Sequence, residues 1–364
     1  MTKTLTAILL ICAFALPGKA QYLAAFLDHR DHFWVFEAGT FTEIEYLEIQ
    51  DFEVGGILVA YKDNGSKLKV YRNGSVEELL IGDPIEFEAT DYLLGYSMYE
   101  QLHVYDNGDT KLLSTQASGY VVQDSLIGWY NRIDQTIQIY YDQRVYTIED
   151  GLIYDPLKTF KTGDNTAAYI HNSTQEFKLF YQGEIIVLDD YAENLHYETG
   201  RDIVAYIDVP DQTFNVFYKG ETLELETFQP KSFKTGDEML VYVDNLGKLK
   251  YFANGETITV SNYEPAFYEV RDKVFVFEEQ GFLKTYCNGS VHTIERYVPR
   301  SYILDFNTIA YLDESQFVKA FQHCEPATIS YKKVTEIDLV RDLIIYVLGI
   351  NETKIYWNGM TYER

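Results

Sequence analysis

The chain has 364 residues, of which 46% are hydrophobic and 24% charged, which is enough apolar material for a folded core and rules out a wholly disordered chain. It carries 56 Asp and Glu against 30 Lys and Arg, for a formal net charge of −26. Because phosphate backbones and anionic lipid surfaces are bound by Lys and Arg, this balance argues against nucleic-acid and membrane-surface partners.

The first twenty residues have the three parts of a secretory leader. Lys3 supplies a positive start, residues 5–16 form an apolar stretch, and Gly18-Lys19-Ala20 is a small-x-small cleavage site. We therefore predict a signal peptide over 1–20, cleavage before Gln21, and export to the periplasm or the extracellular space. No later apolar run has the length of a membrane span, so the mature part, 21–364, is expected to be soluble.

Cysteine is scarce in this chain. Cys12 follows the bulky Ile11 in the middle of the apolar stretch, which does not fit a lipoprotein anchor. Without the leader, only Cys287 and Cys324 remain, and two thiols do not make a disulfide framework. They fall at nearly equivalent places in two neighbouring repeats of the pattern described next, so both one bridge and two free thiols are open.

After the leader, one pattern recurs to the end of the chain. Each copy begins with an apolar residue that is often followed by a Lys. Another apolar residue, an aromatic residue and a turn that usually ends in Gly come next, as in Leu68-Lys69-Val70-Tyr71-Arg72-Asn73-Gly74. The copies follow one another at steps of 34 to 37 residues, with one longer step of 40. The aromatic residue of each copy is Phe36, Tyr71, Tyr105, Tyr140, Phe180, Phe217, Phe252, Tyr286, Phe321 and Tyr356.

A second aromatic marker stands about ten residues earlier in each copy. The markers are Phe26, Tyr61, Tyr96, Trp129, Tyr169, Tyr206, Tyr242, Phe277, Tyr311 and Tyr346. An acidic residue often follows the marker by two positions, as at Asp63 and Asp244. Another acidic or amide residue precedes it by four or five positions: Asp91, Asp124, Asp164, Asp202, Asp237, Asp272, Asn307 and Asp342. Because these polar residues recur, we interpret them as turn formers.

The markers divide each repeat into four short strands. Residues 232–235, 203–206, 68–71 and 221–225 are examples of the first, second, third and fourth strand. Asn-Gly and Lys-Gly pairs accept the positive φ of a tight hairpin between the third and the fourth. The mature chain begins in a second strand at 22–27 and ends in a fourth at 360–363, which predicts thirty-nine strands.

Repeated four-stranded units of about 35 residues predict an all-β propeller of about ten blades. Stacking covers both faces of every sheet, which explains why the neighbours Val70 and Tyr71 are both apolar. One ten-bladed ring, two five-bladed propellers and an open arc all satisfy this pattern.

The repeat resembles the WD40-like, TolB-type propeller repeat, in which an Ile-Ala-Tyr/Phe strand precedes an Ile-Tyr strand and a Gly-containing turn. The matching pieces are Ile203-Val204-Ala205-Tyr206 and Val216-Phe217-Tyr218-Lys219-Gly220. The Ser-Pro-Asp-Gly turn of that family is missing. The resemblance implies a propeller in an exported protein and binding to other proteins, and it carries over no functional residue.

The sharpest local cluster is Asp28-His29-Arg30-Asp31-His32, whose imidazoles and carboxylates are metal-ligand types. It lies in the turn after the first marker, where Asp is expected as a turn former, so we predict no metal site there. Asn-x-Ser/Thr triplets occur at Asn64, Asn73, Asn172, Asn288 and Asn351, and three of them are Asn-Gly-Ser hairpin turns, which turn chemistry explains without glycosylation.

No catalytic or cofactor motif stands out. The sialidase Asp-box, the Gly-x-Ser-x-Gly elbow, the Gly-rich phosphate loop and the calcium loop are all absent from the sequence. In a propeller that cleaves sugars, a catalytic carboxylate would break the repeat and have a raised pKa. We therefore predict no catalytic residue and no cofactor, and keep a glycan-active enzyme as the weakest alternative.

Aromatic residues outside the two marker positions suggest a binding surface. They include Trp34 and Trp357, together with tyrosines that we place in loops: Tyr92, Tyr99, Tyr120, Tyr191, Tyr197 and Tyr263. The resulting prediction is an exported, non-enzymatic propeller that binds a protein partner, with a glycan-binding propeller as the alternative.

Overall fold

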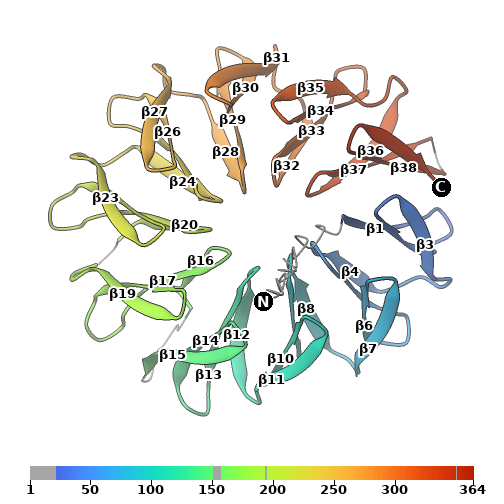
Figure 1. The fold of residues 1–364 in the computed structure, drawn as a ribbon, viewed down its shortest axis with the longest axis horizontal. Coiled ribbons are helices and arrows are strands. Elements are labelled where there is room, and N and C mark those ends of the chain that lie inside the picture. Colours follow the sequence, from blue (N-terminus) through green and yellow to red (C-terminus); the bar gives the residue numbers. More distant parts are fainter. Residues whose placement is uncertain (1–21, 151–156, 193–194, 350) are drawn as a thin grey trace, which may run out of the picture.

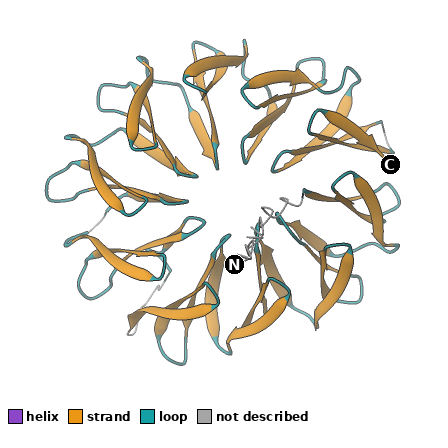
Figure 2. Cartoon of the chain, in the orientation of Figure 1, coloured by secondary structure: helices purple, strands orange, loops and turns teal. Residues whose placement is uncertain are grey.

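The computed structural model describes residues 22–150, 157–192, 195–349 and 351–364. Within these ranges the chain forms ten antiparallel sheets and no helix (Figure 2). The sheets stand side by side around one axis in a single ring, and the first sheet lies next to the last (Figure 1). The predicted all-β propeller is confirmed, and the ten-bladed ring is correct among the three arrangements that the sequence left open.

Each sheet, or blade, has its strands in chain order from the axis outward. The innermost strands are β4 (Asp51–Val54), β8 (Ile85–Ala89), β12 (Ala117–Val122), β16 (Lys161–Thr162), β20 (Tyr197–Gly200), β24 (Ser232–Gly236), β28 (Tyr268–Arg271), β32 (Ser301–Asp305) and β36 (Val334–Val340). The second strands are β1 (Leu23–Leu27), β5 (Val59–Lys62), β9 (Leu93–Met98), β13 (Leu126–Asn131), β17 (Thr166–Ile170), β21 (Ile203–Ile207), β25 (Met239–Val243), β29 (Val274–Glu279), β33 (Thr308–Leu312) and β37 (Leu343–Leu348).

The outer half of each blade is a tight hairpin. The third strands are β2 (Phe33–Glu37), β6 (Lys67–Arg72), β10 (Gln101–Asp106), β14 (Thr136–Tyr141), β18 (Phe177–Tyr181), β22 (Phe214–Tyr218), β26 (Leu249–Ala253), β30 (Phe282–Cys287), β34 (Val318–Gln322) and β38 (Glu352–Trp357). The fourth strands are β3 (Thr40–Glu45), β7 (Ser75–Ile81), β11 (Asp109–Ser114), β15 (Arg144–Asp150), β19 (Glu184–Asp189), β23 (Glu221–Glu226), β27 (Glu256–Ser261), β31 (Ser290–Glu295), β35 (Glu325–Thr328) and β39 (Met360–Glu363).

The hairpin turns adopt the backbone that their residues predict. Asn73 and Gly74 have φ of 51° and 76°, and Asn288 and Gly289 have 47° and 80°. Both central residues of such a turn are left-handed, which Asn and Gly tolerate best. The turns fix the register of each outer hairpin.

The core consists of one apolar layer between each pair of neighbouring blades. Tyr71 packs in the layer with Val59 and Leu23, whereas Val70 packs on the other side of the same sheet with Tyr96 and Leu94. Adjacent residues of a strand point to opposite faces, so both faces must be apolar when both are covered. The stacking explanation for this pattern is therefore confirmed.

A third aromatic position, which the sequence analysis did not recognise, lies on the innermost strands. Phe52 pairs with the marker Tyr61 and Phe233 with the marker Tyr242, nine residues later in both cases. The same pairing joins Phe87 to Tyr96, Tyr120 to Trp129, Tyr197 to Tyr206, Tyr268 to Phe277, and Tyr302 to Tyr311. In the tenth blade Ile337 takes this place opposite Tyr346.

The first blade is incomplete within the described residues: it contains β1, β2 and β3 only. Among the described strands, none is shared between the first and the last blade. The ring closes through side chains, with Ala24, Phe26 and Phe36 packed against Leu343 and Ile355. Arg364 adds an ion pair with Asp28 and lies 4.3 Å from the ring centre of Trp34.

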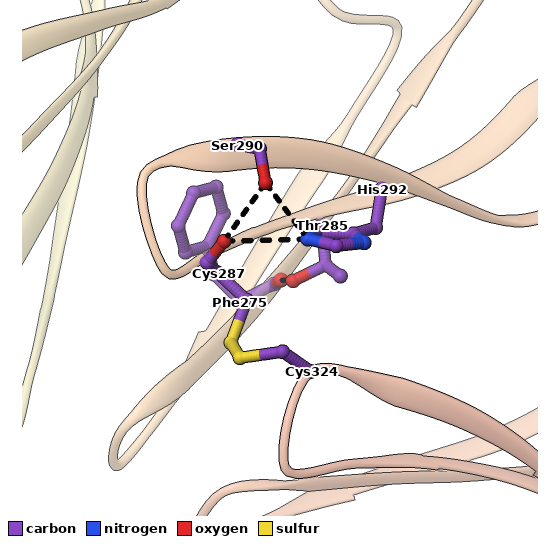
Figure 3. Close-up of a disulfide and its surroundings, with 6 residues drawn as sticks. All are labelled: Phe275, Thr285, Cys287, Ser290, His292 and Cys324. Carbon is purple, nitrogen blue, oxygen red and sulfur yellow. Dashed lines mark hydrogen bonds between the residues drawn. A yellow bond between two sulfur atoms is a disulfide. The ribbon is translucent and has the colours of Figure 1, made fainter.

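One disulfide joins the outer hairpins of the eighth and ninth blades. Cys287, at the end of β30, is bonded to Cys324 in the turn between β34 and β35 (Figure 3). The two Cα atoms are 5.6 Å apart, within the usual range for a disulfide. Of the two possibilities left open for these thiols, the structure has the bridge.

Candidate functional site

The two faces of the ring differ in the segments that build them. On the hairpin face lie the turns from the first to the second strand and from the third to the fourth, such as 55–58 and 73–74. On the loop face lie the turns from the second to the third strand and the connections between blades, such as 63–66 and 46–50. Backbone hydrogen bonds from Gln50 to Lys62 and from Gly82 to Ser66 hold the loop-face segments together.

A polar cavity of about 440 Å³ lies at the axis on the hairpin face. Most of its charged lining comes from a single repeat position, five residues before the marker aromatic. That position is Gly56, Asp91, Asp124, Asp164, Arg201, Asp237, Asp272, Phe306 and Arg341 in blades two to ten. We call the charged residues among them, together with Arg271 and Asp305, the mouth residues.

Arg201 is the centre of the mouth. Its guanidinium lies 2.6 Å from carboxylate oxygens of both Asp124 and Asp164, and 3.4 Å from Asp237. These partners come from three other blades, the fourth, fifth and seventh, so one side chain links four of the ten blades. Bidentate and multiple contacts of this kind suit the planar fork of Arg.

The mouth contains more carboxyl groups than cations, and burial makes it unfavourable for all of these carboxyl groups to be ionised. Burial raises the pKa of Asp124 to about 7, with Asp164 adding to the shift and Arg201 opposing it. Burial raises the pKa of Asp237 to about 7 as well, and Asp164 again adds to it. Near neutral pH the mouth therefore holds protons that ordinary surface Asp residues would have lost.

The opposite side of the mouth is built around Arg341. Its guanidinium pairs with Asp91, a residue 250 positions earlier, and lies next to Gly56. Arg341 thus reaches from the tenth blade past the incomplete first blade to the second and third. Its backbone N–H donates to Asp305, whose pKa is raised to about 6 by burial and by the hydrogen-bonded Asp272.

Close backbone contact keeps the mouth narrow. A Cβ atom on Gly200 would lie 2.1 Å from the carbonyl oxygen of Gly236, and one on Gly236 would lie 2.2 Å from that of Asp272. Backbone hydrogen bonds cross between blades at the same level, from Asp237 to Asp272 and from Glu238 to Arg201. Glycine is required at these two positions because no side chain fits.

Two pairs of carboxyl groups in the mouth are closer together than the spacing used in glycoside hydrolysis. That chemistry needs two carboxyl groups about 5–10 Å apart. Here Asp237 shares a hydrogen bond with Asp164, and Asp305 shares one with Asp272. Asp305 stands outside the repeat position, lines the cavity and has a raised pKa, which are the features that the enzyme alternative predicted; it also contacts Arg341 and Asp272.

On the loop face, the acidic residue two positions after the marker closes the turn. One carboxylate oxygen of Asp63 accepts hydrogen bonds from the N–H groups of Gly65 and Lys67, at 2.8 and 3.0 Å. The other oxygen lies 2.8 Å from Lys69, which also contacts Glu45 of the previous blade at 2.7 Å. The contacts of Lys69 with Asp63 and Glu45 explain why Lys recurs in the third strand. The hydrogen bonds that Asp63 accepts confirm that the acidic residue at this position is a turn former.

The Asp28–His32 motif has the same architecture. Asp28 accepts hydrogen bonds from the N–H groups of Arg30 and His32 and pairs with Arg364. His32 lies 2.5 Å from Glu43, in the fourth strand of the same blade. The carboxylate of Asp28 is thus occupied by turn and closure contacts, and no group of three potential metal ligands occurs among the described residues.

The loop face carries the most exposed large apolar side chains of the described chain. Eight of them are 59–77% exposed, and all eight lie on this face. They are Tyr46, Leu47, Tyr99, Ile133, Phe228, Leu246, Tyr263 and Tyr331. Three of these side chains, here called the loop patch, stand on neighbouring segments: Phe228, Leu246 and Tyr263. The ion pair of Lys231 with Glu264, which lies beside Gly247, links these three segments. Elsewhere on this face, Tyr297, Val298 and Leu312 line a hollow of about 640 Å³.

The predicted loop aromatics divide into three groups. Tyr92, Tyr99, Tyr191 and Tyr263 are exposed in turns and loops, as expected. Trp34 and Trp357 lie in strands, where they pack at the seam between the first and last blades. The placement of Tyr120 and Tyr197 was wrong, because both lie on innermost strands opposite a marker. The constant spacing of nine residues to the marker would have identified them.

Ten blades in one ring, with a charged mouth on one face and apolar loops on the other, define a β-propeller of the large-ring class. A family model described as a 10-bladed beta propeller domain matches residues 18–362. The chain belongs to this family. No curated protein matches the sequence. Within the described residues, no helix is long and apolar enough to cross a membrane.

Solved structures resemble the chain only in fold. The computationally designed Ika8 protein is 11% identical with a TM-score of 0.38, covering 93% of this chain and 99% of its own. Apo AztD from Citrobacter koseri is 12% identical with a TM-score of 0.37, covering 85% and 93%. The CRINKLY WD40 ectodomain of the Arabidopsis thaliana receptor kinase ACR4 is 10% identical with a TM-score of 0.33, covering 67% and 95%.

Proposed function

We propose that this protein is an exported, non-enzymatic propeller that binds a protein partner through its loop face. The observation that carries the proposal is the concentration of the eight most exposed large apolar side chains on that one face. Exposed apolar groups gathered on one surface are typical of interaction sites, because water contact with them is unfavourable until a partner covers them.

A protein partner fits these side chains better than a glycan does. Leu47, Ile133, Phe228 and Leu246 offer no hydrogen bonds to sugar hydroxyls, whereas mixed aliphatic and aromatic side chains are common at the centre of protein interfaces. Tyr46, Tyr99, Tyr263 and Tyr331 could stack on sugar rings and keep glycan binding as the second candidate.

A comparison of two triple variants tests the proposal. Phe228→Ser, Leu246→Ser and Tyr263→Ser together remove the loop patch, while Val76→Ser, Tyr92→Ser and Met360→Ser change as many exposed residues on the hairpin face. We expect a partner captured by the native protein from its own organism to be lost with the first variant and kept with the second. Capture that both variants retain, or specific retention on a glycan array with no protein partner, would contradict the proposal.

Export is part of the same proposal. The Cys287–Cys324 bridge supports it, since such bonds persist in oxidising compartments. The leader-like residues 1–20 support it from the sequence. N-terminal sequencing of the protein isolated from periplasm or medium should begin at Gln21, and a cytosolic protein that still begins at Met1 would refute export.

A further inference from the structure

Four cationic side chains gather on one part of the loop face. They stand on two connections between blades, from β31 to β32 and from β35 to β36, which flank the ninth blade (Figure 1). All four are exposed, and none forms an ion pair within the described part of the chain. They are Arg296, Arg300, Lys332 and Lys333, here called the basic corner. In a chain with a formal net charge of −26, four unpaired cations on two neighbouring connections indicate an anionic partner.

The backbone that carries the basic corner is held against the ninth blade. The N–H of Ser330 donates to the carbonyl oxygen of Val318 at 3.3 Å, and the N–H of Lys332 donates to the hydroxyl of Ser330 at 3.1 Å. On the other connection, the hydroxyl of Tyr297 accepts the N–H of Glu314 at 3.1 Å. Because these segments are already fixed, binding a partner there costs less conformational entropy.

The hollow of about 640 Å³ adjoins the basic corner, since Arg300 belongs to its lining. Its apolar wall consists of Tyr297, Val298 and Leu312. Tyr331, on the connection from β35 to β36, adds a ring that is 77% exposed. This part of the loop face therefore offers a recess for an apolar side chain together with cations beside it.

Two carboxyl groups also line the hollow, and they differ in their contacts. One oxygen of Asp313 accepts the N–H groups of Ser315 and Phe317, at 2.8 and 2.9 Å. The other oxygen lies 3.5 Å from Lys319. Glu314, in contrast, has no ion pair among the described residues. An anionic ligand would be repelled by Glu314 and attracted by the basic corner, so the two can be tested with opposite signs.

We propose that the basic corner and the hollow bind an acidic segment of the partner protein. The segment inserts an apolar side chain into the hollow, and its neighbouring carboxylates contact the basic corner. Opposite charges select the partner and speed its association, while the buried apolar side chain supplies affinity. An acidic glycan would satisfy the cations but not the wall formed by Val298 and Leu312. This inference rests on the proposed function, because it states what the partner of the loop face presents.

A short synthetic peptide is a suitable probe. It contains one leucine with two glutamates on each side and a fluorescent label, and its anisotropy is titrated with the full protein. We expect saturable binding that weakens roughly tenfold between about 50 and 300 mM NaCl, because salt screens the charges. Replacing the leucine with serine should weaken binding about tenfold, since the hollow then stays unfilled. Replacing the glutamates with glutamines should abolish binding.

Protein variants locate the site. Arg300→Gln with Lys332→Gln removes two charges of the basic corner and should weaken binding of the leucine peptide roughly tenfold. Arg144→Gln with Lys158→Gln is the matched control, because it changes the net charge equally at two exposed cations before and after the end of the fourth blade; binding should not change. Glu314→Gln should strengthen binding several-fold by removing the repulsion.

The proposal is overturned if the leucine peptide does not bind, if the serine peptide binds as well, or if the two double variants have the same effect. Binding of a uronic-acid oligosaccharide through Arg300 and Lys332, without binding of the peptide, would assign the basic corner to an acidic glycan instead. The basic corner is intact in the triple variant of the loop patch. Failure of the peptide alone therefore leaves the proposed function standing, and equal capture by the two triple variants refutes the proposed function without changing the peptide result.

Discussion

At the scale of single residues, one repeat position determines the character of the mouth. Five positions before the marker, Asp appears in five blades and Arg in two, and each Arg neutralises carboxylates from other blades. In the sequence these Asp residues look like the polar residues four positions before the marker, such as Asp202 and Asn307, and the turn interpretation therefore covered both positions. Separating the two positions would have revealed Arg201 and Arg341 as exceptions.

The raised pKa values at the mouth predict a pH dependence of stability. A carboxyl whose pKa is about 7 in the folded protein, as for Asp237, and about 4 when unfolded binds more protons in the folded state between these values. The free energy of unfolding contributed by this group therefore falls as the pH rises through that window. Asp237→Asn should flatten the slope between pH 5 and pH 8 by up to about 1.4 kcal/mol per pH unit.

Chemical denaturation at several pH values measures this slope. The exposed Asp109→Asn is the control and should leave the slope unchanged. If Asp237→Asn instead makes the slope more negative, or leaves it as in the native protein, Asp237 does not take up a proton in the folded state.

At the scale of elements, the strands and turns were largely predictable. The alternation of apolar and polar residues, the aromatic markers and the Asn-Gly turns identified β39 with its bounds, and the start of β1 was placed one residue early. The mouth was not predictable in the same way, because its contacts join residues as distant as Asp91 and Arg341. Local patterns determine strands, but the meeting of side chains across the ring depends on how many blades close it and how tightly.

The disulfide also acts at this scale, because it links the outer hairpins of two neighbouring blades. It closes a loop of 37 residues between the eighth and ninth blades, which restricts the unfolded chain. Cys287→Ser with Cys324→Ser should lower the free energy of unfolding by about 2–4 kcal/mol. Denaturant titration of the double variant measures this, and reduction of the native protein is the matched comparison. A loss near zero would mean that the bond does not form in the purified protein.

At the scale of the whole molecule, we expect the closure between the first and last blades to open more readily than the other joints. All other neighbouring blades are linked by the chain itself, whereas this joint relies on an apolar layer and the pair of Arg364 with Asp28. Regions with fewer supporting contacts open more often. The sequence predicted an odd number of strands but not how the ring closes. Closure by side-chain packing does not change the repeated pattern, so the pattern could not reveal it.

Hydrogen exchange tests this ranking of the joints. The amides of Ala24 and Phe26, which bond to β2, should exchange at least roughly tenfold faster than the equivalent amides of Val59 and Tyr61 in β5. Arg364→Ala should widen the difference, whereas Arg132→Ala, which removes an exposed pair with Glu100, should not. Equal protection in β1 and β5 would show that closure is as firm as the other joints.

The odd number of strands also decides which way the two ends of the described chain point. Successive strands alternate in direction, so a chain of thirty-nine strands enters on one face of the ring and leaves on the other, whereas forty would return it to the same face. Tyr22 enters β1 from the hairpin face, and Arg364 leaves β39 on the loop face beside Asp28. A surface or a fused protein attached after Arg364 therefore lies on the side of the loop face. Attachment ahead of Tyr22 leaves the loop face clear and lies instead on the side of the ring where the charged mouth opens.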